Sequence, residues 1–205
     1  MKYIEQNAQT QANIKKAFIS LINEKGFSNL TVSDITRTAG ISRGTFYVHF
    51  TDKFALLEHL ENTIHQSIAA AIQSNIDYAI DNTPNNKAEE LFNTFTFNAA
   101  LDYADSERET IRTLFSEKGD PQFFNQIKDL VDDMISSKLI ASNGHYSDII
   151  PIDYTKQIAI YSILNIIRHW LNKEHPESPA EIATILMRSR FLAPHDLLVF
   201  DDGQA

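Results

Sequence analysis

Residues 31–53 read TVSDITRTAGISRGTFYVHFTDK, and this stretch decides the fold of the N-terminal part of the chain. Thr31 and Asp34 have the spacing of a capping box, in which a hydroxyl and a carboxylate each accept a hydrogen bond at a helix N-terminus. Gly40 tolerates the left-handed conformation that follows a last helical residue, and Ser42 can cap a second helix directly behind it. The stretch therefore predicts a helix, a tight turn and a second helix.

The second helix has one apolar face and one outward face of hydrogen-bond donors. Phe46 and Phe50 lie four residues apart and share the apolar face, which packs on the helix that begins after Thr31. The outward residues are Arg43, Thr45, Tyr47, Val48 and His49. This surface suits a DNA major groove, because Arg can hold a guanine edge with two bonds while Tyr and His donate to phosphates. The alternative is an ordinary helical hairpin with a polar outer face, which does not explain why caps, turn and outward residues agree.

This part of the chain contains a closely spaced series of motif residues. The series is Gly26-Phe27, Thr31-Val32, Ile35, Ala39-Gly40-Ile41-Ser42, Gly44-Thr45-Phe46-Tyr47, His49-Phe50, Lys53 and Leu56-Leu57. With it, residues 11–57 resemble the N-terminal domain of the TetR/AcrR family of bacterial transcriptional regulators. The resemblance implies an all-α protein with a three-helix DNA-binding head on a larger helical body that dimerises and usually senses a small molecule.

The residues and the resemblance together mark a DNA-binding surface on the head. The expected DNA contacts are Thr31, Ser33, Ser42, Arg43, Gly44, Thr45, Tyr47, His49 and Lys53. Gly44 would let the helix N-terminus approach the DNA backbone closely, and the resemblance implies that Lys53 reaches a phosphate. Three positions depart from the family pattern: Thr36 stands where the family most often has Ala, Gln11 stands where an Arg often touches phosphate, and Phe54 replaces a usual acidic residue.

Composition and charge limit the classes of function. The chain has 205 residues, is 43% apolar and carries a net charge of -9, so it can bury a substantial core. Residues 1–54 hold seven basic against four acidic side chains, which leaves the remainder at -12. This asymmetry favours presenting only the head to DNA, although an acidic surface kept for solubility would look the same over the body.

Cysteine is absent from the sequence, so disulfides, thiolate metal sites and cysteine nucleophiles are excluded. The histidines form no metal-binding pair, and we expect neither a metal nor a cofactor. The N-terminal MKYIEQNAQTQ lacks an apolar signal region, and Ser162 and Asn165 interrupt the longest apolar run. We therefore expect neither secretion nor a membrane span, and a bacterial cytoplasmic location.

Hydrophobic spacing predicts about nine helices and no strand. The expected helices after the head cover about 52–80, 87–103, 106–117, 121–140, 153–173 and 179–190, and the first helix covers about 10–25. NTPNN at 82–86 predicts a loop, and Asn143-Gly144 predicts a turn. We expect two domains, a helix-turn-helix DNA-binding domain at 1–54 and a helical dimerisation and effector-binding domain at 55–205.

The penultimate helix is apolar around most of its circumference, which requires burial on several sides. The simplest burial is a four-helix packing of the last two helices against the same pair of a second chain. The residues expected in this homodimer interface are Ile163, Leu164, Ile167, Trp170, Ile182, Ile185 and Leu186. Burial within the monomer alone is the alternative.

The body also carries more aromatic residues than its aliphatic core requires. With nearby cationic groups able to orient a polar or anionic ligand, they predict an effector pocket. The expected lining is Phe92, Phe95, Arg112, Phe115, Phe124, Tyr161, Arg168 and His169. The alternative is that the aromatic side chains simply fill the core.

The sequence thus indicates a transcriptional regulator that binds a near-palindromic double-stranded DNA operator, and we expect a repressor released by an unidentified small molecule. A protein partner could replace the small molecule, and the regulator could then be an activator. The C-terminal sequence WLNKEHPESPAEIATIL also resembles a TetR subgroup typified by the dihydroxyacetone-kinase regulator. Catalysis is a remote alternative: Gly40 to Gly44 fits G-x-S-x-G, but that motif needs a preceding strand, so we do not expect an enzyme.

Overall fold

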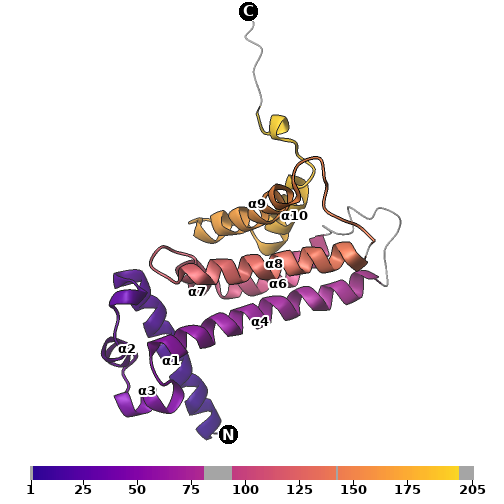
Figure 1. Ribbon diagram of the computed structural model, residues 1–205. Coiled ribbons are helices and arrows are strands. Elements are labelled where there is room, and N and C mark those ends of the chain that lie inside the picture. Colours follow the sequence, from indigo (N-terminus) through magenta and orange to yellow (C-terminus); the bar gives the residue numbers. More distant parts are fainter. Residues whose placement is uncertain (1, 81–93, 142, 199–205) are drawn as a thin grey trace, which may run out of the picture. The chain divides into compact units, whose positions relative to one another are not determined.

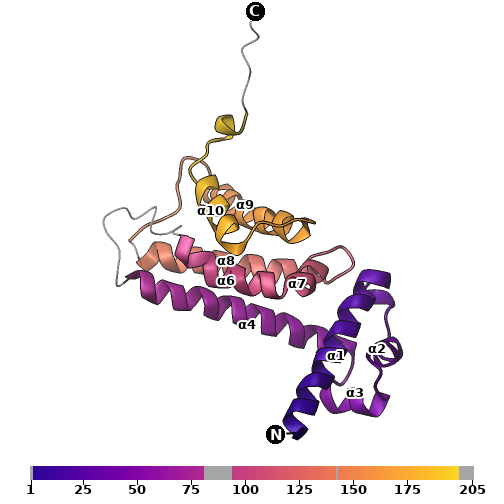
Figure 2. The same cartoon turned by 180° about the vertical axis from the view of Figure 1, so that it is seen from behind.

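The computed structural model describes residues 2–80, 94–141 and 143–198 (Figures 1 and 2). Nine α-helices and two short 3-10 helices occupy these residues, which contain no strand. By packing, the chain divides into two compact units. The first comprises Met1–Ala69 with Ser106–Val131, and the second comprises Ala70–Asp105 with Asp132–Ala205.

The first unit begins with α1 (Lys2–Lys25), α2 (Val32–Ala39) and α3 (Arg43–His49). In both views α1 runs beside α2 and α3, and α4 (Lys53–Ile80) starts directly after α3 (Figures 1 and 2). The core beneath them includes Ile14, Phe18 and Phe46, whose side chains are fully buried. Helix α1 starts eight residues before the expected Thr10, in agreement with a stretch that holds neither Gly nor Pro.

Two later segments of the chain complete this unit. Helix α7 (Arg108–Leu114) packs on α1, and an ion pair joins Lys15 to Glu107 at the start of α7. Behind α7, the carbonyl of Lys118 accepts from the Phe27 amide at 2.9 Å. An added Cβ at Gly119 would lie 2.4 Å from the Leu114 carbonyl, so the close turn before α8 requires glycine. The first unit is therefore larger than the 1–54 segment that carries the sequence motif.

The second unit contains α6 (Thr94–Ser106), α9 (Ile152–Asn172) and α10 (Pro179–Ser189), with the end of α8 (Pro121–Ala141). Helices α9 and α10 lie side by side in both views (Figures 1 and 2). Ser178 opens α10 with a capping box to Glu181 and Pro179 occupies the first turn, as the local chemistry requires.

Apart from the early start of α1, the expected helix pattern agrees with the structure to within a few residues wherever both can be compared. The expected turn at Asn143-Gly144 is present, and Asn143 has a positive φ of 54°. The expected loop at 82–86 and the first residues of the 87–103 helix lie outside the described residues. Among the helices that are described, none is long and apolar enough to cross a lipid bilayer.

Candidate nucleic-acid interface

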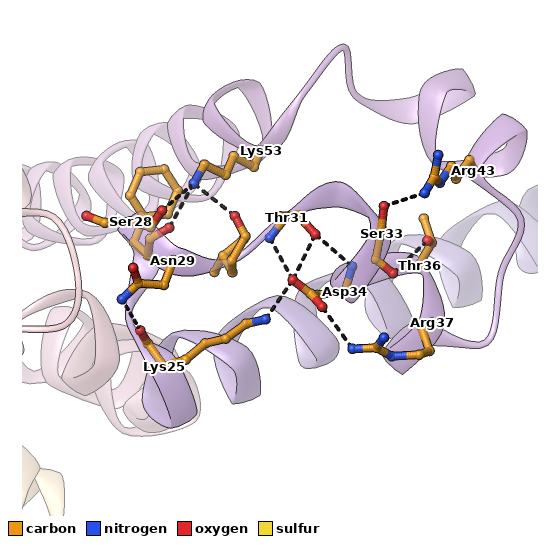
Figure 3. A network of polar contacts seen from close by, with 12 residues as sticks. Lys25, Ser28, Asn29, Thr31, Ser33, Asp34, Thr36, Arg37, Arg43 and Lys53 are labelled. Atoms are coloured by element: carbon orange, nitrogen blue, oxygen red, sulfur yellow. Dashed lines mark hydrogen bonds and ion pairs between the residues drawn. The ribbon is translucent and has the colours of Figure 1, made fainter.

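The start of α2 is fixed by the capping box that the sequence predicts. The Thr31 hydroxyl accepts from the Asp34 amide at 3.2 Å, and the Asp34 carboxylate accepts from the Thr31 amide at 3.0 Å (Figure 3). The same carboxylate pairs with Lys25 Nζ at 2.6 Å and Arg37 Nη2 at 2.8 Å. The pKa of Asp34 lies far below its usual range, because Lys25 and Thr31 donate hydrogen bonds to its charged form. Lys25 makes the larger contribution.

The turn between α2 and α3 has the expected glycine geometry. Gly40 has φ 67° and ψ 32°, and its amide donates to the carbonyls at the end of α2. Ser42 then accepts from the Thr45 amide at 3.0 Å and so caps α3. The Ser42 hydroxyl of the G-x-S-x-G match is therefore a helix cap that follows a helix, and no strand precedes it in the described residues.

Helix α3 divides into the two faces that the sequence predicts. Phe46 is fully buried and packs its ring against Phe50 at 5.9 Å between centroids. Tyr47 and Val48 are 56% and 77% exposed, and Arg43 is exposed as well. The outward face is therefore open to a macromolecular partner, with its amphipathic orientation set by Phe46.

Ser33 and Arg43 lie together although ten residues separate them. Arg43 Nη2 donates to the Ser33 hydroxyl at 2.6 Å and so joins the first turn of α3 to the first turn of α2 (Figure 3). An added Cβ at Gly44 would meet only the Ser42 hydroxyl, at an ordinary 3.6 Å. The free protein thus has room for a side chain at this position, so any need for glycine there must come from a partner.

Lys53, which is expected to contact a phosphate, is hydrogen-bonded within the head in the free chain. Its Nζ donates to the carbonyls of Phe27, Ser28 and Leu30, at 3.0, 3.1 and 2.9 Å (Figure 3). An ammonium has three N–H donors, so a phosphate contact would displace at least one of these bonds. Lys53 is half-buried in the free chain, and its contact with a phosphate stays a prediction.

A groove beside α3 was missed by the sequence reasoning. It has a volume of about 340 Å³ and is open to solvent. Its lining comes from the first turns of α1 and the outer side of α3: Gln6, Asn7, Thr10, Thr45, Val48 and His49. The uncharged run from Gln6 to Asn13, without a helix breaker, is the signal that could have extended the first helix to this point.

The residues expected to line an effector pocket fall in both compact units. Phe115 contacts Phe124 with 5.8 Å between ring centroids, and it contacts Phe123 at 5.1 Å, so these rings form an aromatic cluster. Tyr161 is half-buried, whereas Arg112, Arg168 and His169 are exposed. Phe92 and the side chain of Phe95 lie outside the described part of the chain. The pocket itself stays a prediction.

The residues expected at the dimer interface differ in their exposure within the single chain. The five that are buried in the single chain, each at most 3% exposed, are Ile163, Leu164, Trp170, Ile182 and Leu186. Trp170 Nε1 also donates to the Glu177 carbonyl at 2.8 Å. Only Ile167, half-buried, and Ile185, 41% exposed, are open to another chain. The protomer itself therefore covers part of the apolar circumference of α9, and the dimer interface stays a prediction.

This arrangement of capped helices, glycine turn and exposed α3 defines a helix-turn-helix protein. The family model for bacterial regulatory proteins of the tetR family matches residues 14–60, and the model for a transcriptional regulator C-terminal region matches residues 93–190. The chain belongs to the TetR family.

Known relatives agree with this assignment. The uncharacterized HTH-type transcriptional regulator YxbF of Bacillus subtilis (strain 168) is 22% identical over 176 residues, which cover 84% of this chain and 42% of YxbF. The HTH-type dhaKLM operon transcriptional activator DhaS of Lactococcus lactis subsp. lactis (strain IL1403) is 38% identical over 69 residues, 34% of this chain and 35% of DhaS. The chain thus spans less than half the length of these two curated relatives.

A solved structure supports the fold over most of the chain. The crystal structure of a TetR transcriptional regulator from Streptococcus agalactiae 2603V covers 92% of this chain and 97% of its own, with a TM-score of 0.58 and 23% identity. At this identity the likeness concerns the fold alone.

Proposed function

We propose that the protein is a sequence-specific DNA-binding transcriptional regulator whose α3 enters the major groove of an operator half-site. The observation that carries the proposal is the outward face of α3, where Arg43, Tyr47 and Val48 are exposed while Phe46 is buried beneath them. A short helix presented in this way fits the major groove, whose width admits one α-helix. We propose a bacterial cytoplasmic location for the protein, because a DNA operator would be met there.

Three kinds of contact follow from the chemistry of this surface. Arg43 can hold the O6 and N7 atoms of a guanine with two bonds, which gives specificity. Thr45, Tyr47 and His49 can donate to phosphates or bases along the groove wall. At the start of α2, Thr31 and Ser33 can reach the backbone, and Gly44 admits a close approach of α3. The basic excess of residues 1–54 supports the choice of this segment as the DNA-binding domain.

We propose a homodimer that reads a near-palindromic operator, with the two α3 helices roughly 34 Å apart, one turn of DNA. Members of this family bind operators as dimers, and the remainder of the chain from residue 55 would supply the interface. Exposed apolar side chains on α9 and α10 support this assignment, since Ile158 is 64% and Ile185 41% exposed in the single chain. These positions replace Ile163 and Leu164 as the centre of the proposed contact.

We further propose that a small-molecule effector releases the protein from DNA as a repressor. A ligand shifts the operator equilibrium only by its differential affinity, so a hundredfold release needs roughly 2.7 kcal/mol of coupling. The second candidate is an activator that works with a protein partner. The similarity to DhaS, which is named as an operon activator, is the observation that favours it.

The proposal is tested with purified protein and the promoter regions of its own and neighbouring genes. Fluorescence anisotropy should detect a duplex bound with nanomolar to subnanomolar affinity, and footprinting should show two protected half-sites. Compounds that raise the melting temperature are then measured with and without operator, because coupling is reciprocal. Equal binding of every promoter and of random DNA would contradict sequence-specific recognition.

A further inference from the structure

The ammonium of Lys53 is fully engaged inside the head. It donates to three carbonyls of the segment between α1 and α2, those of Phe27, Ser28 and Leu30, all within 3.1 Å (Figure 3). Three converging carbonyls form a concave, negatively polarised site that matches the three donors of one ammonium. The charge of Lys53 is thereby balanced by backbone dipoles.

Two aromatic rings close the site from the sides. Lys53 Nζ lies 4.8 Å from the centre of the Phe27 ring and 5.4 Å from that of Phe54. The two rings meet edge to face, with 5.4 Å between centroids and 84° between planes. A cation near aromatic faces is attracted by their quadrupole. Phe54, which stands where the family pattern has an acidic residue, makes this contact while it is 61% exposed.

The site joins two points that determine how the helix-turn-helix is held. Phe27 to Leu30 lead directly into the Thr31 cap of α2, and buried Leu30 anchors them in the core. Lys53 is the first residue of α4, three residues after Phe50, the C-cap of α3. One side chain therefore ties the segment that enters α2 to the start of α4, close behind α3.

We propose that Lys53 is a positioning residue, which clamps the segment 27–30 against the start of α4 and so aligns α2 and α3 for DNA without giving its charge to a phosphate. The proposal rests on the proposed DNA-binding function. It distinguishes lysine from arginine, because a planar guanidinium cannot direct three N–H groups at three carbonyls that converge on one point.

The experiment compares Lys53→Met, Lys53→Arg and Phe54→Leu with the wild-type protein. In the free protein, melting temperature and the water exchange of the Lys53 ammonium protons, followed by NMR, report on the clamp itself. With DNA, affinities for operator and for random duplex are measured over a range of salt, at a temperature well below each melting point. Lys16→Met, at an exposed lysine of α1, is the control for loss of one positive charge.

If Lys53 is a clamp, both Lys53 variants should melt at least about 5 °C lower and lose about ten- to a hundredfold in operator affinity. The ratio of operator to random affinity should fall, while the slope of log K against log salt stays as in the wild type. Phe54→Leu, which keeps the charge, should lose about two- to fivefold with the same slope. The Lys16→Met protein should melt as the wild type does.

A phosphate contact gives a different pattern. It predicts that Lys53→Met lowers the slope by about 0.9 for each phosphate lost, that Lys53→Arg binds almost normally and that Phe54→Leu has no effect. Either this slope change, or fast exchange of the Lys53 ammonium protons in the free protein, would overturn the clamp. If the wild type binds no operator while the free-protein measurements agree with the clamp, the proposed function fails and not the clamp.

Discussion

Arg43 donates to the Ser33 hydroxyl across 2.6 Å, which joins the first turn of α3 to the first turn of α2. The bond uses one of the five N–H donors of the guanidinium, so the others remain able to meet a base edge. Holding the side chain in this way lowers the entropy that it would lose on binding. In the proposed complex, Ser33 would therefore act on the DNA contact through Arg43 as well as directly.

Arg43→Ala should weaken operator binding by roughly 1 to 3 kcal/mol and relax the preference at one base pair of each half-site. Arg43→Lys should lose most of the same discrimination, because a point charge cannot form the two parallel bonds. Competition with operators substituted at each position measures both effects. Unchanged preference at every position in the alanine variant would show that Arg43 reads no base.

Gly40 and Gly44 should respond to alanine in opposite ways. Gly40→Ala should destabilise the protein by about 1 kcal/mol, because its φ of 67° is unfavourable for any residue with a Cβ. Gly44→Ala should leave the melting temperature unchanged or raise it, since alanine is the better helix former and has room in the free protein.

If α3 approaches the DNA backbone closely, Gly44→Ala should nevertheless weaken operator binding. Thermal melts and operator titrations of the two variants separate the effects. A Gly44→Ala protein that binds the operator as well as the wild type would remove this residue from the interface.

Asp34→Asn should lower the melting temperature at neutral pH, because the amide keeps an acceptor for Thr31 but loses the charge that pairs with Lys25. The folded-state pKa of Asp34 is depressed, so its contribution is present above the unfolded pKa of about 3.9 and is lost as the pH falls through the folded value. The difference between wild type and variant should therefore narrow below about pH 4. A constant difference from pH 7 to pH 2 would show that charge is not the cause.

Glu61 is a buried carboxyl, 5% exposed, on the part of α4 that belongs to the first unit. Burial raises the pKa of Glu61 to about 7, and repulsion from Asp120 and then Glu58 adds to the effect. The hydrogen bond with Gln126 acts in the opposite direction and lowers the pKa. A raised folded-state pKa means that stability is greatest below the unfolded value of about 4.3 and falls as the pH rises to about 7.

Glu61→Gln should therefore remove this pH dependence. From pH 4 to pH 8, the free energy of unfolding of the wild type should fall by up to about 3 kcal/mol more than that of Glu61→Gln. Urea unfolding at several pH values between 4 and 8 measures the change. Glu58→Gln, at an exposed position one turn away, is the control and should shift the curve only slightly. Parallel stability curves for wild type and Glu61→Gln would contradict a raised pKa.

Ile158→Asp and Ile185→Asp should give monomers that keep their helical content and lose operator affinity, because a lone charge in an apolar interface is costly. Ile163→Asp should instead unfold the protein, since its side chain is 2% exposed in the single chain. Sedimentation velocity and circular dichroism distinguish the two outcomes. Ile140→Asp, on α8 and 78% exposed, is the control. Dimers of unchanged stability in both surface variants would place the interface elsewhere.

The sequence by itself determined the local structure of the head. The Thr31 capping box, the left-handed Gly40, the Ser42 cap and the burial of Phe46 all follow from residues within a few positions of one another. Such features depend on backbone hydrogen bonds and helical periodicity, which act over one or two turns. For this reason the helix boundaries near residues 32–53 could be predicted closely.

Only the tertiary structure decided which partners the distant side chains have. Lys53 is 23 residues from Leu30 in the sequence. Its ammonium can donate to the three carbonyls of the 27–30 segment only when the start of α4 packs beside that segment. The apolar periodicity of α9 likewise required burial but could not say whether this chain or a second one covers Ile163. Hydrophobic patterning fixes that a face is buried, because transfer from water is non-directional; the packing of elements far apart in the sequence fixes what it is buried against.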